Sequence, residues 1–139
     1  MPIRGLDSLR RRLEDIDKPY NDALRTILMQ SLGNIAAGTP VDEGRARSNW
    51  FLKIGSPSTE VTDSTDGNDH LDRMPNRVLG RVIYYANNLP YINALEYGGY
   101  RGVGDKTIAA SGGIYSDQAA GGWVRGELMR MQSAIRNIR

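Results

Sequence analysis

The strongest hint of catalysis in this sequence is a glycine-rich stretch, residues 99–107 (Gly-Tyr-Arg-Gly-Val-Gly-Asp-Lys-Thr), which is similar to a phosphate-binding loop. That loop needs a lysine directly after its second glycine, so that the amine reaches the β- and γ-phosphates. Here Asp105 separates Gly104 from Lys106. The segment before the stretch lacks the pattern of a buried parallel strand, and the segment after it is a poor helix former. We therefore interpret it as a surface loop, with a small nucleotide hydrolase as a distant third alternative.

Aspartates recur at every third residue in one segment of the chain, with glycine and asparagine among them: Asp63, Asp66, Asp69 and Asp72. Aspartate-rich loops supply oxygen ligands to Ca²⁺, but this spacing does not match the EF-hand loop, which alternates its ligands and ends in a glutamate. His70 could act as a general base, yet no nucleophile occupies a recognisable turn beside it. We predict a solvated acidic loop and assign no catalytic residue, metal or cofactor.

The charge of the chain is nearly balanced but unevenly distributed. A formal net charge of +2 is too small to indicate a nucleic-acid binder. Residues 55–72 hold five acidic residues and no lysine or arginine, whereas the last segment holds Arg125, Arg130, Arg136 and Arg139 against Glu127. Opposite charge at two ends would suit head-to-tail association between copies, and a solvated surface explains it equally well. The chain has no cysteine, which excludes disulfides and thiolate metal sites.

The length of 139 residues has room for one α+β domain, residues 1–139. No stretch approaches the roughly 20 apolar residues that a membrane-spanning helix needs. The first residues lack the apolar core of a secretory signal. We therefore expect synthesis in the cytoplasm and no membrane partner.

A long N-terminal helix is the element that the sequence predicts most clearly. Apolar residues follow a three-four spacing that marks one helix face: Leu6, Leu9, Leu13, Ile16, Tyr20, Leu24, Ile27 and Ile35. Pro19 interrupts the pattern, so we expect a break or kink near Lys18, with Asp17 capping a second helix. The helix should end at residues 37–40, where glycine and proline follow one another.

Two β-prone segments, Ser48–Ile54 and Val78–Tyr85, predict a small antiparallel sheet. The polar segment between them, about residues 55–76, is longer than most loops of a compact domain, so we expect a flexible arm or a hairpin tip that orders on assembly.

The rest of the chain predicts a turn and a short helix over Ala86–Tyr97, with Pro90 in its first turn and Gly98 at its end. Residues 98–122 are dense in glycine and predict a second flexible arm. From Trp123 to Arg139 we expect an amphipathic helix that packs on the sheet beside the first helix. Its predicted apolar face consists of Val124, Leu128, Met131, Ile135 and Ile138.

Three segments carry a resemblance to a known family. They are residues 39–50 (Thr-Pro-Val-Asp-Glu-Gly-Arg-Ala-Arg-Ser-Asn-Trp), residues 85–98 (Tyr-Ala-Asn-Asn-Leu-Pro-Tyr-Ile-Asn-Ala-Leu-Glu-Tyr-Gly) and residues 122–125 (Gly-Trp-Val-Arg). In order and separation they resemble the small phage tail-component proteins typified by the tenth gene product of phage Hong Kong 97. Glu43 and Ala46 stand where that family usually has threonine and leucine.

The residues of these segments also make physical sense on their own. Pro40 and Gly44 favour a tight reversal in which Asp42 accepts backbone amide hydrogens, and Trp50 anchors the following strand. Glu96 and Arg125 could form a charge-assisted pair between the short helix and the last one. The full set of motif residues that we expect at structural contacts or interfaces is Asp42, Gly44, Arg45, Arg47, Trp50, Pro90, Tyr91, Glu96, Tyr97, Gly98 and Arg125.

The resemblance implies a structural protein of the virion that forms a closed ring, commonly six-fold, at the head-to-tail junction or the upper end of the tail. Its partners would be copies of itself, the head connector, adaptor or stopper proteins, and tail-tube or tail-terminator proteins. DNA would pass through the channel without specific binding. The alternative from another class is a DNA-binding or packaging accessory protein that uses the arginine-rich helices.

Overall fold

The computed structural model describes residues 5–40, 44–97, 114–116, 119–120 and 122–138. The chain is an α+β protein, as predicted. Its elements, in chain order, are helix α1 (Leu6–Gly38), strand β1 (Trp50–Ile54), strand β2 (Ile83–Asn87), helix α2 (Ile92–Tyr97), strands β3 (Ile114–Ser116) and β4 (Ala119–Ala120), and helix α3 (Trp123–Arg136). Single 3-10 turns lie at Arg47–Asn49 and Leu71–Arg73.

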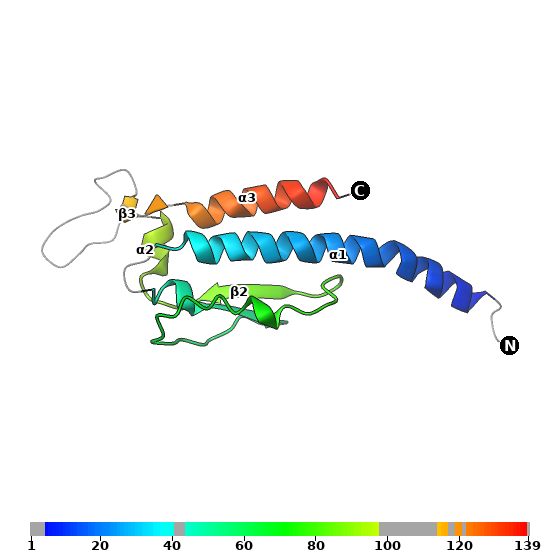
Figure 1. The fold of residues 1–139 in the computed structure, drawn as a ribbon, viewed down its shortest axis with the longest axis horizontal. Helices are drawn as coiled ribbons and strands as arrows, with labels where there is room; N and C mark the ends of the chain where they lie inside the picture. The colour runs from blue at the N-terminus through cyan, green and yellow to red at the C-terminus, as the bar shows by residue number, and fades with distance from the viewer. Residues whose placement is uncertain (1–4, 41–43, 98–113, 117–118, 121, 139) are drawn as a thin grey trace, which may run out of the picture.

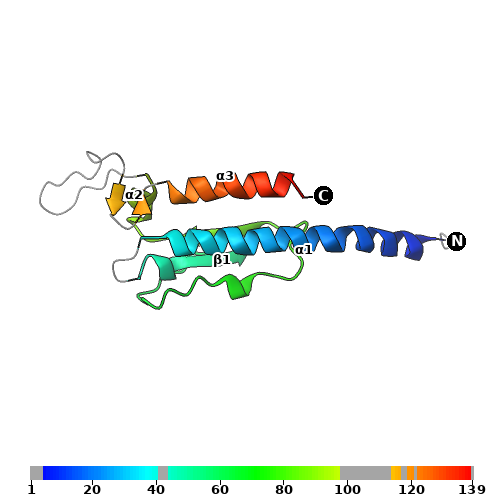
Figure 2. The ribbon, with the colours of Figure 1, turned by 45° about the horizontal axis from the view of Figure 1, so that its top comes forward.

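Helix α1 is the central layer of the fold. The β1–β2 sheet lies on one side of it and α3 on the other, and the N-terminal part of α1 extends beyond both (Figures 1 and 2). Helix α3 runs antiparallel to α1 (Figure 1). With 33 residues in α1 and 14 in α3, a rise of about 1.5 Å per residue leaves roughly half of α1 without a neighbouring helix.

The predicted break in α1 is absent, because the helix runs without interruption through Pro19. No second helix begins at Asp17, whose carboxylate instead lies 3.6 Å from the guanidinium of Arg77. The proline falls on the exposed part of the helix, where water can satisfy the carbonyl that loses its amide partner. Figure 1 shows this part of α1 sloping away from the axis of the rest. The predicted end of the helix is confirmed, since Gly38 is its last residue.

The sheet is a single antiparallel pair, as predicted. Trp50 lies opposite Asn87, Leu52 opposite Tyr85, and Ile54 opposite Ile83. The predicted boundaries shift in two places. Ser48 and Asn49 belong to the 3-10 turn before β1, and β2 starts five residues later than expected and runs to Asn87.

The core lies between α1 and the inner face of the sheet. Helix α1 contributes Leu32, Ile35 and Ala36, and β1 contributes Trp50 and Leu52. The segment between the strands adds three more buried side chains: Leu71, Met74 and Val78.

Helix α3 packs mainly on α1, not on the sheet as predicted. The indole of Trp123 donates to the backbone oxygen of Ile35 (2.9 Å), and the amide of Asn34 donates to the carboxylate of Glu127 (3.0 Å). Polar contacts thus join the two helices beside the apolar packing of Trp123 and Val124, and the apolar face of α3 is only partly covered: Leu128 is 38% exposed.

The segment of residues 55–76 contains one 3-10 turn and no strand. It lies against the body, where the hydroxyl of Tyr85 donates to the backbone oxygen of Asp69 (2.8 Å), and the ion pair of Arg73 and Glu60 (2.6 Å) braces it internally. Its flexibility stays a prediction. Most of the second predicted arm, residues 98–122, lies outside the described residues, and its described part contains the short antiparallel pair of β3 and β4.

Candidate functional site

The three segments that carry the resemblance meet at the C-terminal end of α1 (Figure 1). We call this place the motif junction and define it as residues 44–50, 87–97 and 122–125. The side-chain amide of Asn87 donates to the backbone oxygen of Ala46 (2.9 Å), which ties the second segment to the first. Ala46, Leu89 and Leu95 form a small buried cluster that Trp123 covers from the third segment. The junction therefore joins parts of the chain that are far apart in sequence.

Gly44 is placed by a backbone that other residues rarely adopt. Its φ is +89°, and a Cβ atom at this position would lie 2.7 Å from the backbone oxygen of Thr65. The same residue accepts hydrogen bonds from the backbone amide (3.1 Å) and hydroxyl (2.9 Å) of Ser48. The tight reversal that the sequence predicts here thus depends on glycine for both conformation and space.

Two arginines of the first segment bind backbone oxygens. Arg47 donates to the oxygen of Ala37 (2.6 Å), which lies in the last turn of α1 and lacks a partner within the helix. Arg45 donates to the oxygen of Thr62 (3.4 Å) and pairs with the exposed carboxylate of Asp63 (3.2 Å). These arginines position the reversal against its neighbours.

Asn49 is fully buried and was not predicted as a site residue. Its amide nitrogen donates to the backbone oxygens of Arg45 (2.7 Å) and Thr62 (2.9 Å), and its amide oxygen accepts from the backbone nitrogen of Thr62 (2.9 Å). This one side chain holds the long segment against the start of β1. In the sequence it stands next to the motif tryptophan, and nothing in its type or spacing distinguishes it from a surface asparagine.

Asn21 on α1 acts in the same way and was also missed. It is buried, its amide nitrogen donates to the backbone oxygen of Asn76 (2.8 Å), and its amide oxygen accepts from the backbone nitrogens of Val78 (2.8 Å) and Leu79 (3.1 Å). The turn before β2 is therefore fastened to the middle of the long helix.

Trp50 is the core anchor that the sequence predicts. Its ring stacks on that of Tyr85 across the strand pair, with centroids 5.2 Å apart, and its indole nitrogen donates to the hydroxyl of Thr39 (2.8 Å). Thr39 in turn donates to the backbone oxygen of Ile35 (2.9 Å). The tryptophan therefore joins the sheet to the end of α1. Burial, followed by the nearby charge of Asp69, raises the pKa of Tyr85 far above its ordinary value.

Glu96 and Arg125 form the pair that the sequence predicts, and the contact is more extensive than a salt bridge. Glu96 is buried, and its carboxylate accepts the backbone amides of Val124 (3.0 Å) and Arg125 (2.9 Å) in the first turn of α3. The guanidinium of Arg125 donates to the same carboxylate (3.0 Å) and to the backbone oxygen of Glu96 (3.1 Å). One side chain of α2 thus caps the N-terminus of α3, where a negative charge is favourable.

The remaining motif residues of α2 surround this cap. Tyr97 is 63% exposed and lies under the guanidinium of Arg125, 4.5 Å from carbon to ring centroid. Pro90 and Tyr91 form the turn that leads into α2, and Tyr91 packs against the buried cluster of the junction. Asp42 and Gly98 lie outside the described residues.

Glu127 is a second buried carboxylate, one turn further along α3. Its carboxylate accepts from Asn34 of α1 (3.0 Å) and from Arg130 (2.8 Å). Burial opposes ionisation of the carboxyl, but the hydrogen bonds from Asn34 and Arg130 outweigh it and hold its pKa below the ordinary value of 4.5.

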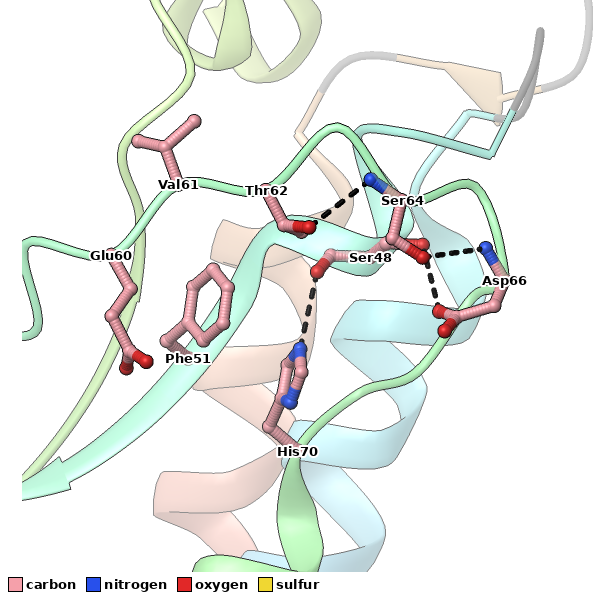
Figure 3. A pocket seen from close by; sticks show the side chains of 8 residues that line it. All are labelled: Ser48, Phe51, Glu60, Val61, Thr62, Ser64, Asp66 and His70. Carbon is pink, nitrogen blue, oxygen red and sulfur yellow. Dashed lines mark hydrogen bonds between the residues drawn. The ribbon is translucent and has the colours of Figure 1, made fainter.

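Ser48, His70 and Asp66 line one open pocket and superficially resemble a catalytic trio (Figure 3). The ring nitrogen Nε2 of His70 lies 3.2 Å from the backbone oxygen of Ser48, not from its hydroxyl. That hydroxyl is fully buried, donates to the oxygen of Gly44 and accepts from the amide of Gly67 (2.7 Å). The hydroxyl also lies 3.4 Å from the carboxylate of Asp66, so its contacts tie the turn before β1 to the long segment.

An apolar surface lies on the part of α1 that extends beyond the body. We call it the projecting stripe, and it consists of Leu6, Leu9, Leu13, Ile16 and Tyr20. These side chains are between 40% and 68% exposed. An exposed stripe of large apolar side chains at three-four spacing marks an interaction surface.

No protein-family model, curated protein or solved structure matches this chain. Within the described residues, no group of three or more histidine, cysteine, aspartate or glutamate side chains could hold a metal ion. In the same residues, no helix is both long and apolar enough to cross a membrane.

Proposed function

We propose that this chain is a structural virion protein of a tailed bacteriophage, one that forms a ring at the head-to-tail junction or upper tail end. The ring joins tail to head and leaves a channel for DNA. The proposal starts from the three motif segments in the sequence, which resemble those of small phage tail-component proteins.

The observation that carries the proposal is the projecting stripe. Leu13 and Ile16 are 50% and 68% exposed on a helix that continues into the core of the same molecule. A chain that works alone gains nothing from holding such side chains in water, since each buried leucine-sized group contributes about 1.5–3 kcal/mol. An assembly protein gains a rigid, preformed contact surface.

The motif junction supports the same reading. Its polar side chains form hydrogen bonds to backbone groups and to each other. Glu96 accepts hydrogen bonds from α3, and Asn49 donates one to the long segment. Such contacts fix the angles between the elements that they join. A structural protein of an assembly needs such fixed angles to keep its contact surfaces in place.

The ring proposal is tested by electron microscopy of the purified full chain, alone and on the connector of the same phage. Closed rings with a central hole are expected. A DNA gel shift on the same sample tests the alternative: binding that weakens steeply with salt, without rings, would replace the assembly proposal with a DNA-binding or packaging role.

A further inference from the structure

Helix α1 takes part in two apolar features that have no partner within the described residues. One is the projecting stripe on its N-terminal half. The other, which we call the apolar groove, lies beside its C-terminal half between the sheet and α3 and measures about 240 Å³. The groove is lined by Leu28, Leu32, Ile35, Trp50, Ile83, Tyr85, Val124, Leu128 and Met131.

A polar contact between α3 and α1 lies beside the groove. Glu127 is buried against Asn34, so the adjacent Leu128, about 100° further around the helix, faces partly into the groove and stays 38% exposed. On the far side β2 presents Ile83 and Tyr85, both half-buried. The walls are aliphatic and aromatic, which suits the apolar face of a helix.

The stripe has the pattern of a helix that lies in such a groove. Leu9, Leu13, Ile16 and Tyr20 follow one another at steps of four, three and four residues, the spacing of the anchors by which helices enter apolar grooves. The stripe spans 15 residues of α1, and α3, which forms one wall of the groove, has 14. The groove lining covers only residues 28–35 of α1 and 124–131 of α3, so the groove matches the stripe in chemistry and receives part of its length.

The exposed area of the stripe is also what a stable interface requires. At exposed fractions of 40–68%, its five side chains leave on the order of 450 Å² of apolar surface in water, about the apolar share of a standard interface of roughly 800 Å² per partner.

The stripe cannot fill the groove of its own molecule. The stripe and one wall of the groove belong to one continuous helix, and the N-terminal part of α1 extends beyond the sheet and α3 (Figures 1 and 2). No other described segment of this chain offers such a helix face, and a second copy supplies a helix of the right pattern. One patch would then meet a different patch on the neighbour, which is the geometry that closes into rings.

We propose that the projecting stripe of one copy lies in the apolar groove of the next copy. This inference deepens the proposed ring and rests on it for the identity of the partner. It names the two surfaces that meet: α1 residues 6–20 on one side, and the wall formed by α1, β2 and α3 on the other.

The chain has no cysteine, so single-cysteine variants give an unambiguous test. Full-length Ile16→Cys and an affinity-tagged Leu128→Cys are mixed and oxidised, and the mixed disulfide is separated by its mass. We expect roughly tenfold more mixed disulfide than with Ser8→Cys, which lies off the stripe on the same helix, because a disulfide needs Cβ atoms within about 4 Å. Met131→Cys replaces Leu128→Cys if the latter lowers the melting temperature.

Two outcomes overturn the inference. One is a mixed disulfide no more abundant than that of the Ser8→Cys control, and the other is a product dominated by disulfides between two Ile16→Cys chains. Sedimentation of the unmodified chain separates this failure from failure of the ring. If the chain sediments as an assembly of several copies but forms no mixed disulfide, this contact is rejected and the proposed ring is retained. If the chain sediments as a monomer at every concentration, both this contact and a ring formed by the chain alone are rejected.

Discussion

The carboxylate of Glu96 caps the helix in which Arg125 lies, and the guanidinium of Arg125 closes over the same carboxylate. The oxygens of Glu96 lie 2.9 and 3.0 Å from the amides of Arg125 and Val124, and 3.0 Å from Nε of Arg125. Helix α3 begins at Trp123, and the N-cap residue before it, Gly122, has φ +91° and supplies no side-chain cap. Its start is therefore fixed by a residue that lies 28 positions earlier in the chain.

Glu96→Gln should lower the free energy of unfolding by about 2 kcal/mol, measured by urea denaturation. The variant amide removes the negative charge and turns one of its two acceptors into a donor that faces backbone N–H groups. Glu14→Gln removes an exposed carboxylate from α1 and should leave stability within about 0.5 kcal/mol. Equal stability of the two variants would mean that the cap is dispensable.

Gly44→Ala tests the tight reversal of the first motif. The new Cβ would meet the oxygen of Thr65 at 2.7 Å in addition to the strain of φ +89°. Gly55 is a matched control, because its φ is +85° and nothing lies within 4 Å of its Cβ position. We expect about 1 kcal/mol of destabilisation for Gly55→Ala and at least about 2 kcal/mol more for Gly44→Ala. Similar melting temperatures for the two variants would contradict the account of Gly44.

Asn49→Ala should destabilise the fold by about 3 kcal/mol, because it leaves backbone groups of Arg45 and Thr62 buried without their partner. Hydrogen exchange should rise first at Thr62, whose amide loses its acceptor. Asn93→Ala, at an exposed position of α2, is the control and should change neither property. Unchanged protection of the Thr62 amide would show that the segment is held by other contacts.

Glu127 should make α3 sensitive to acid. Its pKa is lowered in the folded state, so between pH 4.5 and that lower value the unfolded chain binds more protons than the folded one. The stability that Glu127 contributes is therefore present above pH 4.5 and is lost as the pH falls through the folded pKa. Urea midpoints of the unmodified chain and of Glu127→Gln should differ at pH 7 and converge as the pH falls below the folded pKa of Glu127. A constant difference across this range would exclude the ionised carboxylate as the cause.

The order and type of the main elements could be predicted because their apolar spacing is local information. Residues close together in the sequence are enough to predict the apolar stripe of α1 and the β-prone runs around Trp50 and Tyr85. The same holds for the short helix before Gly98. The Glu96–Arg125 pair was also predictable, since two complementary charges stood in motifs of the same resemblance.

The packing of α3 and the buried amides could not be predicted in the same way. The apolar face of α3 fits a sheet as well as a helix, and the choice depends on Asn34 meeting Glu127 across 93 positions of sequence. Asparagine is usually found at the surface, so the residue type of Asn21 and Asn49 does not predict burial. Their burial depends on hydrogen bonds to backbone groups that are distant in sequence. Pro19 predicted a break or a kink, and the break is absent because this part of the helix is open to water, which the sequence does not say.

The most direct test of the central claim is electron microscopy of particles made by the phage that encodes this chain, after its gene has been interrupted by a stop codon. The account predicts DNA-filled heads and complete tails that remain separate, with joining restored by the unmodified chain and not by Leu13→Glu/Ile16→Glu, two changes confined to the projecting stripe. Joined, infectious particles in the absence of the chain would contradict the claim.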